Sequence, residues 1–323
     1  MMRRKTGIAA GFAIMILTAS LALSACGGGL SKEAQEYRAQ GIEAYENSDF
    51  ETAAEEFEKA LEEVGDRVSE KEMDIRYYLA ASLYGIADYD GALAQYDTLA
   101  AEDEENYRPY FLRGCVYAKT GRIDEADGEF KEAIVRNGAD FDLYISIYQT
   151  LADAGEQKRG TVYLKRAKKI EAEKPEEYCK LGHIYYLLED YDNARTNLSE
   201  AVDNDVLDAM LYLGMTEAKA GNTDEAKKSF EEFANRKKDD AAAIGRLAAS
   251  MLSCGMAEES IPYYEEAISM TEGEEQKDYK KGLIGAYEQI TDFDKAKELA
   301  EEYVAAWPED QEAAKELEFL STR

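Results

Sequence analysis

Few side chains in this sequence are suited to chemistry, and the best-placed pair is Cys179 and His183. His183 is the one histidine of the chain, and it follows Cys179 by four residues. On a helix this spacing puts a thiolate and an imidazole on one face, where both could bind a zinc ion. A zinc site needs at least one more ligand, and Cys115 lies far from this pair in the sequence. We therefore predict no metal site.

The rest of the sequence contains no catalytic constellation. A single histidine leaves Ser–His relays and histidine-rich metal centres without their main component. The 68 acidic residues are spread along helical stretches at solvent-facing spacings. Asp203-Asn204-Asp205 lacks the glycine and the distal glutamate of a calcium loop. We predict that the chain is not an enzyme and needs no cofactor.

Cys26 is the other residue with a chemical role, because of the residues that precede it. Arg3, Arg4 and Lys5 form a positively charged start, and residues 7–25 are apolar or small. This order is typical of a secretory signal. The apolar run also just reaches the length of a transmembrane helix, and Arg3-Arg4 admits a twin-arginine export signal as a further alternative.

The segment Leu23-Ser24-Ala25-Cys26 resembles the lipobox of bacterial lipoproteins. The resemblance implies a diacylglyceryl group on the Cys26 sulfur and cleavage after Ala25. We expect residues 1–25 to be a signal peptide and residues 26–33 to be a lipidated tether, made flexible by Gly27, Gly28 and Gly29. Two acyl chains would anchor the chain stably. The predicted location is extracytoplasmic, on a bacterial cell membrane.

The charge of the chain limits its partners. Its net charge of −30 becomes −33 when residues 1–25 leave, because they carry three basic residues and no acidic one. A field of this sign disfavours nucleic acid. The 23 tyrosines argue against disorder, and the four prolines in a chain rich in Ala, Glu, Lys and Leu indicate an all-α fold. Cys115, Cys179 and Cys254 indicate no disulfide framework.

A repeat organises the rest of the chain. Small residues recur in one column, mostly 34 residues apart, and a bulky apolar residue follows four positions later in seven of eight cases. A second column, mostly glycine or alanine, stands twelve residues earlier. The small-residue column is Ala53, Ala92, Ala126, Gly160, Ala194, Ala226, Ser260 and Ala296. Turn signals fall between the two columns, and we expect five aspartates after them to be helix N-caps: Asp90, Asp124, Asp192, Asp224 and Asp294.

This helix–turn–helix period resembles the tetratricopeptide repeat. The units most similar to it are "YCKLGHIYYLLEDYDNARTNLSEA" and "YFLRGCVYAKTGRIDEADGEFKEA". The resemblance covers residues 34–308 and implies a right-handed α-solenoid of about eight units. The fourth unit departs from the pattern with Tyr148 in a glycine position. Residues 309–323 should form a capping helix with Ala313, Leu317 and Leu320 on its apolar side.

In this family the first helix of each pair lines a concave groove, and the i, i+4, i+7 rule selects its exposed residues. They are unusually apolar for a surface, and an exposed apolar strip usually marks a binding site. We expect acidic residues at its edge (Asp74, Asp142, Asp153, Glu176 and Asp208) and a small contribution of the strip to the core. The predicted groove residues are Tyr77, Tyr84, Phe111, Cys115, Ile145, Cys179, His183, Tyr186, Leu211 and Met215.

These features predict a membrane-anchored extracytoplasmic scaffold that binds a protein or peptide partner, apolar with some basic residues, in assembling a cell-envelope complex. The alternative is a lipoprotein that captures a small ligand such as a glycan. A basic run over residues 158–169 stands out in this acidic chain. It is either a solvated face or a contact for an anionic envelope polymer.

Overall fold

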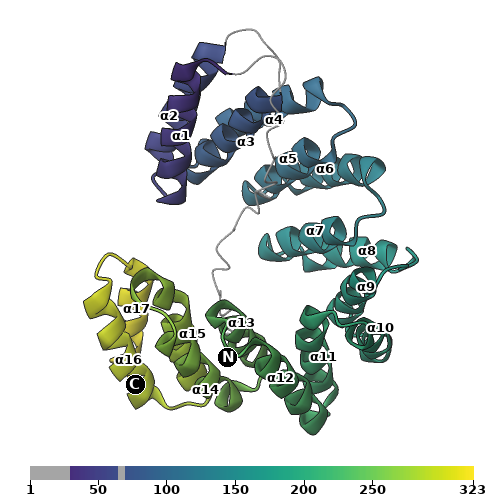
Figure 1. Ribbon diagram of the computed structural model, residues 1–323, viewed down its shortest axis with the longest axis vertical. Helices are drawn as coiled ribbons and strands as arrows, with labels where there is room; N and C mark the ends of the chain where they lie inside the picture. The colour runs from purple at the N-terminus through teal and green to yellow at the C-terminus, as the bar shows by residue number, and fades with distance from the viewer. Residues whose placement is uncertain (1–29, 65–69) are drawn as a thin grey trace. The chain divides into compact units, whose positions relative to one another are not determined.

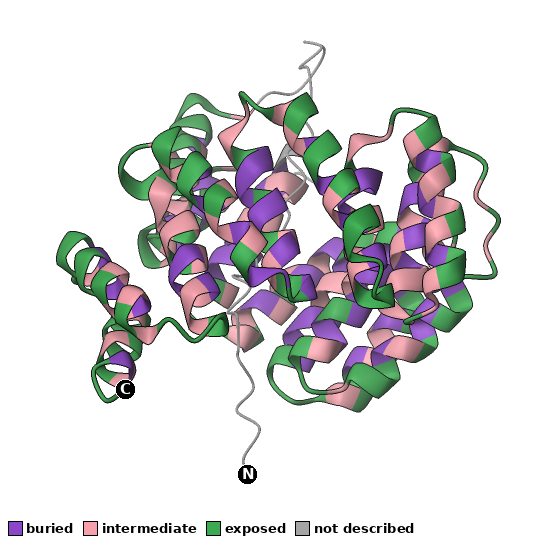
Figure 2. Cartoon of the chain, turned by 90° about the horizontal axis from the view of Figure 1, so that it is seen from below, coloured by how far each residue is buried: buried purple, intermediate pink, exposed green. Residues whose placement is uncertain are grey.

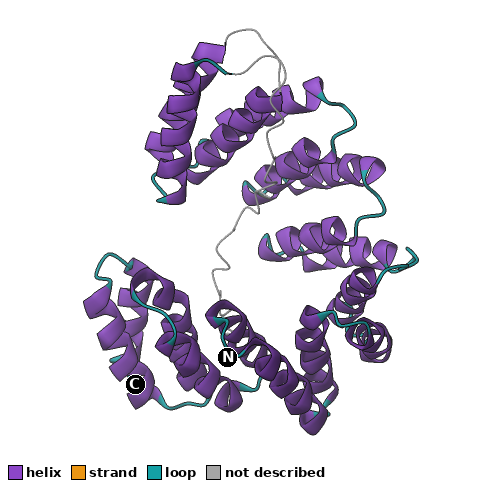
Figure 3. Ribbon diagram, in the orientation of Figure 1, coloured by secondary structure: helices purple, strands orange, loops and turns teal. Residues whose placement is uncertain are grey.

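The computed structural model describes residues 30–64 and 70–323 of the chain. Over these residues it contains 17 α-helices, one 3-10 helix and no strand (Figure 3). The α-helices follow one another as eight antiparallel pairs and a single last helix (Figure 1). The all-α, helix-pair architecture predicted from the repeat is therefore confirmed.

The helix bounds match the repeat columns. The first helices of the pairs are α1 (Lys32–Glu46), α3 (Glu70–Gly85), α5 (Tyr107–Lys119), α7 (Phe141–Asp153), α9 (Pro175–Leu187), α11 (Leu207–Ala220), α13 (Ala241–Cys254) and α15 (Lys277–Gln289). The second helices are α2 (Phe50–Val64), α4 (Tyr89–Glu102), α6 (Ile123–Arg136), α8 (Gln157–Ala167), α10 (Tyr191–Asp203), α12 (Thr223–Lys237), α14 (Ala257–Ser269) and α16 (Phe293–Ala306). The 3-10 helix η1 (Gly273–Gln276) precedes α15, and α17 (Gln311–Leu320) follows the last pair.

The chain divides into two compact units. The first contains the described residues up to Gly138 together with Thr150–Glu156, and the second contains Ala139–Gln149 and Gln157–Arg323. In each unit, buried residues recur along the helices and the connecting loops are largely exposed (Figure 2). No helix in the described ranges is both long and apolar enough to cross a membrane.

A glycine on the first helix and a bulky residue on the second hold several pairs together. A Cβ atom added to Gly41 would lie 2.8 Å from the ring of Phe57, which is fully buried. The same close approach joins Gly114 to Phe130 and Gly214 to Phe230, and in another pair Gly182 meets Leu198. The small column thus lets two helix backbones approach and the bulky column fills the gap, as the sequence predicted.

The fourth pair exchanges these two roles. Tyr148 stands where six of the other seven first helices have glycine or alanine, and it is 8% exposed. Gly160 faces it from α8, where a Cβ would lie 3.0 Å from the Tyr148 ring. Gln157 donates a hydrogen bond of 3.1 Å to the Tyr148 hydroxyl. The unusual tyrosine is therefore compensated by the unusual glycine within the same pair.

Every pair turns through one residue in the left-handed region of φ. Four of these residues are glycines, Gly121, Gly155, Gly221 and Gly255, with φ between 75° and 95°. The other four are Ser48, Ala87, Glu189 and Thr291. The turn positions predicted from the sequence are therefore confirmed, although half of the turns lack the residue best suited to this conformation.

The predicted N-caps are wrong by two residues. The caps of α4 and α16 are Asp88 and Asp292, whose carboxylates accept hydrogen bonds from the backbone of Gly91 and Lys295. Asp90 and Asp294 instead lie in the first turn of these helices. The same shift moves Asp124, Asp192 and Asp224 into first turns. There a negative charge stabilises the positive end of the helix without capping it.

The last helix covers the end of the second unit. Leu320 is 2% exposed, and Ala313, Leu317 and Phe319 pack around it against the side chains of α16. Trp307, just beyond α16, is 7% exposed and donates a 2.7 Å hydrogen bond to Glu274. The predicted apolar side of the capping helix is confirmed.

Candidate functional site

The ten predicted groove residues all lie on first helices, but they are less exposed than expected. Cys115, Ile145, Cys179 and Leu211 are buried, between 5% and 8% exposed. The other six are half-buried: Tyr77, Tyr84, Phe111, His183, Tyr186 and Met215. The expectation that this strip contributes little to the core is therefore wrong. Its role in binding a partner stays a prediction.

In the first unit these residues pack against their neighbours. Tyr84 meets Tyr89 edge to face at 5.5 Å, and Phe111 tilts against Phe130 at 5.9 Å. The Cys115 sulfur lies 3.7 Å from the Thr150 hydroxyl, and burial raises the pKa of this thiol to about 12. Side chains in this state stabilise the fold and leave little surface for a ligand.

In the second unit the aromatic residues of α9 and α11 form a stack. The rings of His183 and Tyr212 lie 4.1 Å apart and are inclined by 19°. Burial lowers the pKa of His183 to about 4, so the imidazole is neutral at pH 7. Burial also raises the pKa of Cys179 to about 12, which makes it a thiol. Within the described residues no group of three or more potential ligands could hold a metal ion.

Ion pairs between consecutive first helices neutralise part of the predicted acidic edge. In the first unit the Arg38 guanidinium of α1 donates hydrogen bonds to Asp74 of α3, and Arg38 Nε lies 2.9 Å from Asp74 Oδ2. In the second unit Lys180 of α9 donates to Asp142 of α7. Exposed pairs of this kind contribute only about 0–1 kcal/mol to stability. They do remove negative charge from the face that a basic partner was expected to contact.

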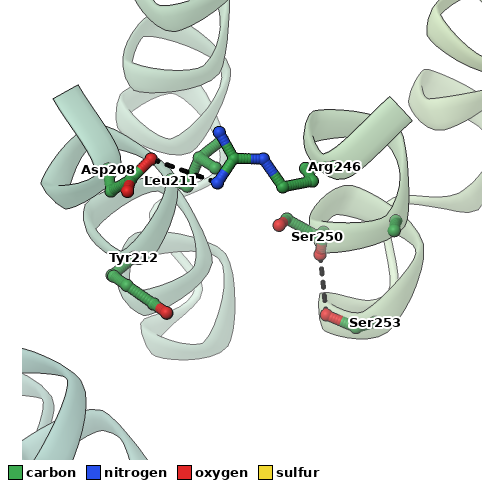
Figure 4. A pocket seen from close by; sticks show the side chains of 7 residues that line it. Asp208, Leu211, Tyr212, Arg246, Ser250 and Ser253 are labelled. Carbon is green, nitrogen blue, oxygen red and sulfur yellow. Dashed lines mark hydrogen bonds and ion pairs between the residues drawn. The ribbon is translucent and has the colours of Figure 1, made fainter. Parts of the chain in front are cut away.

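The third such pair lies at a hollow between α11 and α13 (Figure 4). Arg246 extends from α13 toward Asp208 of α11, and the two groups are 3.5 Å apart with 56% of each side chain exposed. The hollow has a volume of about 350 Å³. Its lining residues are Asp208, Leu211, Tyr212, Arg246, Ala249, Ser250 and Ser253.

The lining of this hollow combines three kinds of contact. Tyr212 and Leu211 supply apolar surface on α11, and the stack with His183 holds the Tyr212 ring in place from behind. Ser250 offers a hydroxyl from α13, whereas the Ser253 hydroxyl donates a 2.8 Å hydrogen bond to the Ser250 carbonyl. Asp208 and Arg246 each keep a polar edge in solvent. This arrangement can bind a polar backbone and an apolar side chain together.

Sequence reasoning reached only part of this site. Leu211 and Asp208 were predicted, but the residues of α13 were missed because the groove was followed no further than α11. A signal was present, since Arg246 follows Asp208 by the same 38 residues that separate Lys180 from Asp142. Cys26, the predicted lipidation site, lies outside the described residues.

Comparison with known proteins places these helix pairs among the helical repeat proteins. Models of the tetratricopeptide repeat match residues 38–106 and 77–141, residues 178–205 and residues 208–239. The matched residues make up about half of the chain. The chain therefore belongs to the tetratricopeptide-repeat family. No curated protein matches it.

Three solved structures are similar to this chain at low sequence identity. A tetratricopeptide repeat protein from Parabacteroides merdae ATCC 43184 is 14% identical, with a TM-score of 0.50 over 91% of this chain and 100% of its own. The APC/C hetero-tetramer Cut9–Hcn1 is 16% identical, with a TM-score of 0.41 over 91% of this chain and 57% of its own. YrrB, a TPR protein with an unusual peptide-binding site, is 18% identical, with a TM-score of 0.33 over 55% of this chain and 92% of its own. The similarity to the Parabacteroides protein supports a shared fold and no more.

Proposed function

We propose that the chain is a non-enzymatic scaffold that binds an extended peptide segment of a partner protein in the hollow between α11 and α13. The observation that carries the proposal is the lining of that hollow. It joins apolar surface on Tyr212 and Leu211 to hydrogen-bonding groups on Ser250 and Arg246. An extended peptide presents the same alternation of apolar side chains and backbone polar groups.

The ion pair at the rim favours a partner segment of mixed charge. Asp208 can accept from a lysine or arginine of the peptide, and Arg246 can donate to a carbonyl or carboxylate. Because both side chains are 56% exposed, breaking their mutual contact costs little. The partner can therefore replace each half of the pair. This refines the predicted partner, apolar with basic residues, by adding an acceptor beside the basic group.

The location of the scaffold belongs to the same proposal. The lipobox-like segment ending at Cys26 supports attachment to the outer side of a bacterial membrane through lipid on that sulfur. A scaffold held there would act in assembling a protein complex of the cell envelope. The support for this part is the sequence before residue 30 alone.

Filling the hollow tests the binding proposal. Ser250→Trp places an indole among the lining residues, and Ser269→Trp places the same indole at the exposed end of α14 as a matched control. In native pull-downs from envelope extracts, the first variant should lose at least nine-tenths of the partner protein and the second should keep it. Equal retention by both variants would show that the hollow does not bind the partner.

The small-ligand alternative gives a different result in the same preparation. A hollow of about 350 Å³ falls within the size range of small-molecule sites. Native mass spectrometry of the purified chain would then show a low-mass adduct that Ser250→Trp removes, with no protein partner captured. That outcome would show that the hollow binds a small ligand and not a peptide.

A further inference from the structure

One surface of the second unit has the opposite charge to the chain as a whole. Its basic residues lie on α8 and the turn that follows, and every one of them is exposed. We call this set the α8 basic surface. It consists of Lys158, Arg159, Lys165, Arg166, Lys168 and Lys169.

The helix dipole does not account for Lys158 at the start of α8. The other seven second helices each carry at least one acidic residue in the first turn, where a negative charge stabilises the helix dipole. In α8 the first turn contains no acid, and Lys158 stands there instead. A positive charge at this end opposes the dipole. The position therefore costs stability that the chain avoids in its other repeats.

Half of the charges of this surface are not used inside the described part of the protein. Lys158, Lys165 and Lys169 form no ion pair there. Lys168 lies over the Tyr185 ring at 5.9 Å, and Arg166 acts electrostatically on Tyr144. Lys165 and Arg166 lie in the last turn, where they favour the helix dipole. Even if both serve that purpose, Lys158 and Lys169 are available to a partner.

The shape of the partner follows from the charge around this surface. The chain carries a net charge of −30, so acidic residues surround this surface. A broad anionic partner, such as a flat membrane or a second copy of the chain, would be repelled by those acidic residues. Screening at physiological salt limits attraction to about 8 Å. A narrow strand can follow the basic residues within that distance and avoid the acidic regions.

The α8 basic surface also offers few apolar or aromatic side chains, which an acidic peptide or a nucleic acid would need for contacts beyond charge. Its one large exposed apolar side chain in the described structure of α8 is Val162, which is 65% exposed. Tyr163, the aromatic residue of α8, is 6% exposed and cannot stack on a base. The buried side of α8 is committed to the core through Leu164 and Ala167. An acidic peptide or a nucleic acid would therefore gain little beyond charge.

We propose that the α8 basic surface binds a linear polyanion without bases, whose closely spaced phosphate groups follow the helix and the turn after it. Along α8, Lys158 and Arg166 are separated by roughly 12 Å at 1.5 Å per residue. A strand of a few phosphate units spans that length. This site is separate from the hollow between α11 and α13 and does not depend on the peptide-binding proposal.

The test uses the full chain and labelled inorganic polyphosphate. Lys165→Gln, Arg166→Gln and Lys169→Gln are combined in one variant. Its matched control combines Lys228→Gln, Lys238→Gln and Lys315→Gln, which remove the same charge from exposed positions on other elements. Fluorescence anisotropy should show binding at least tenfold weaker for the first variant and within twofold of the unmodified chain for the control.

Salt dependence gives a second readout. Three lost phosphate contacts should make the slope of log K against log salt shallower by about 2, at about 0.7 per contact for a single strand. Equal weakening of both variants, or none in either, would overturn the proposal. So would loss of binding to phosphatidylglycerol vesicles or polyglutamate that matches the loss for polyphosphate, because the partner would then be a membrane or an acidic peptide. Ser250→Trp should leave polyphosphate binding unchanged, which separates this site from the proposed peptide site.

Discussion

The contact between Gly114 and Phe130 allows a sharp test of how the helix pairs are held together. A Cβ atom at Gly114 would lie closer than 3.0 Å to two atoms of the Phe130 ring, which is fully buried. Gly128 on α6 is a matched control in the same helix pair, because it is exposed and nothing lies within 4 Å of its Cβ position. Both glycines stand within helices, so alanine has the same intrinsic effect at each.

The expected energies follow from these surroundings. Replacing glycine by alanine within an exposed helix stabilises it by about 0.8–1.0 kcal/mol, so Gly128→Ala should raise stability by that amount. Gly114→Ala gains the same term but forces the ring aside, and overpacking typically costs about 1–3 kcal/mol. The free energy of unfolding of Gly114→Ala should therefore be about 1–3 kcal/mol lower than that of Gly128→Ala.

Urea denaturation followed by circular dichroism measures this difference. Hydrogen exchange at the amides of α5 and α6 gives the local value, because stability in a repeat protein is distributed over neighbouring repeats. If Gly114→Ala is stabilised as much as Gly128→Ala, the glycine and the ring are not in contact. The role assigned to the glycine column would then be wrong.

Three further predictions concern other parts of the chain. Replacing Cys26 by serine should abolish incorporation of labelled fatty acid, and absence of label in the unmodified chain would contradict lipid anchoring. Burial, with Glu316 beside it, raises the pKa of Glu288 on α15 to about 7 from an ordinary 4.5, so its protonated form favours folding. Docking of α17 should be most stable below pH 4.5 and weaken as the pH rises through 7, and Glu288→Gln should remove this dependence in hydrogen exchange of α17. Lys158→Glu should raise the free energy of unfolding of α8 by about 0.3–1 kcal/mol through the helix dipole, and it should weaken polyphosphate binding. A loss of stability would contradict the cost proposed for a positive charge at that position.

The repeat was predictable because its period and its columns are properties of the sequence. Glycine at 41, 114, 182 and 214 indicated close approach of helices, and the structure shows that approach. The N-caps were misplaced because two aspartates two residues apart both suit the start of a helix. Only backbone geometry shows that Asp88, not Asp90, accepts the capping hydrogen bond.

The exposure of the groove was not predictable from one helix at a time. The i, i+4, i+7 rule describes a face of an isolated helix, but α9 packs on α11 and α11 on α13. These contacts bury Cys179 and Leu211, and Leu211 keeps only an edge in the hollow between α11 and α13. Arg246 and Ser250 were missed because their importance depends on a neighbouring helix.

Site-specific photo-crosslinking tests the central claim most directly. A benzoylphenylalanine placed at position 250 should react with a partner protein, and the crosslinked peptide should contain an apolar residue near a lysine or arginine. The same probe at position 269, at the exposed end of α14, should give no adduct with that partner. An adduct from position 269 but not from position 250 would contradict the assignment of the hollow as the peptide-binding site.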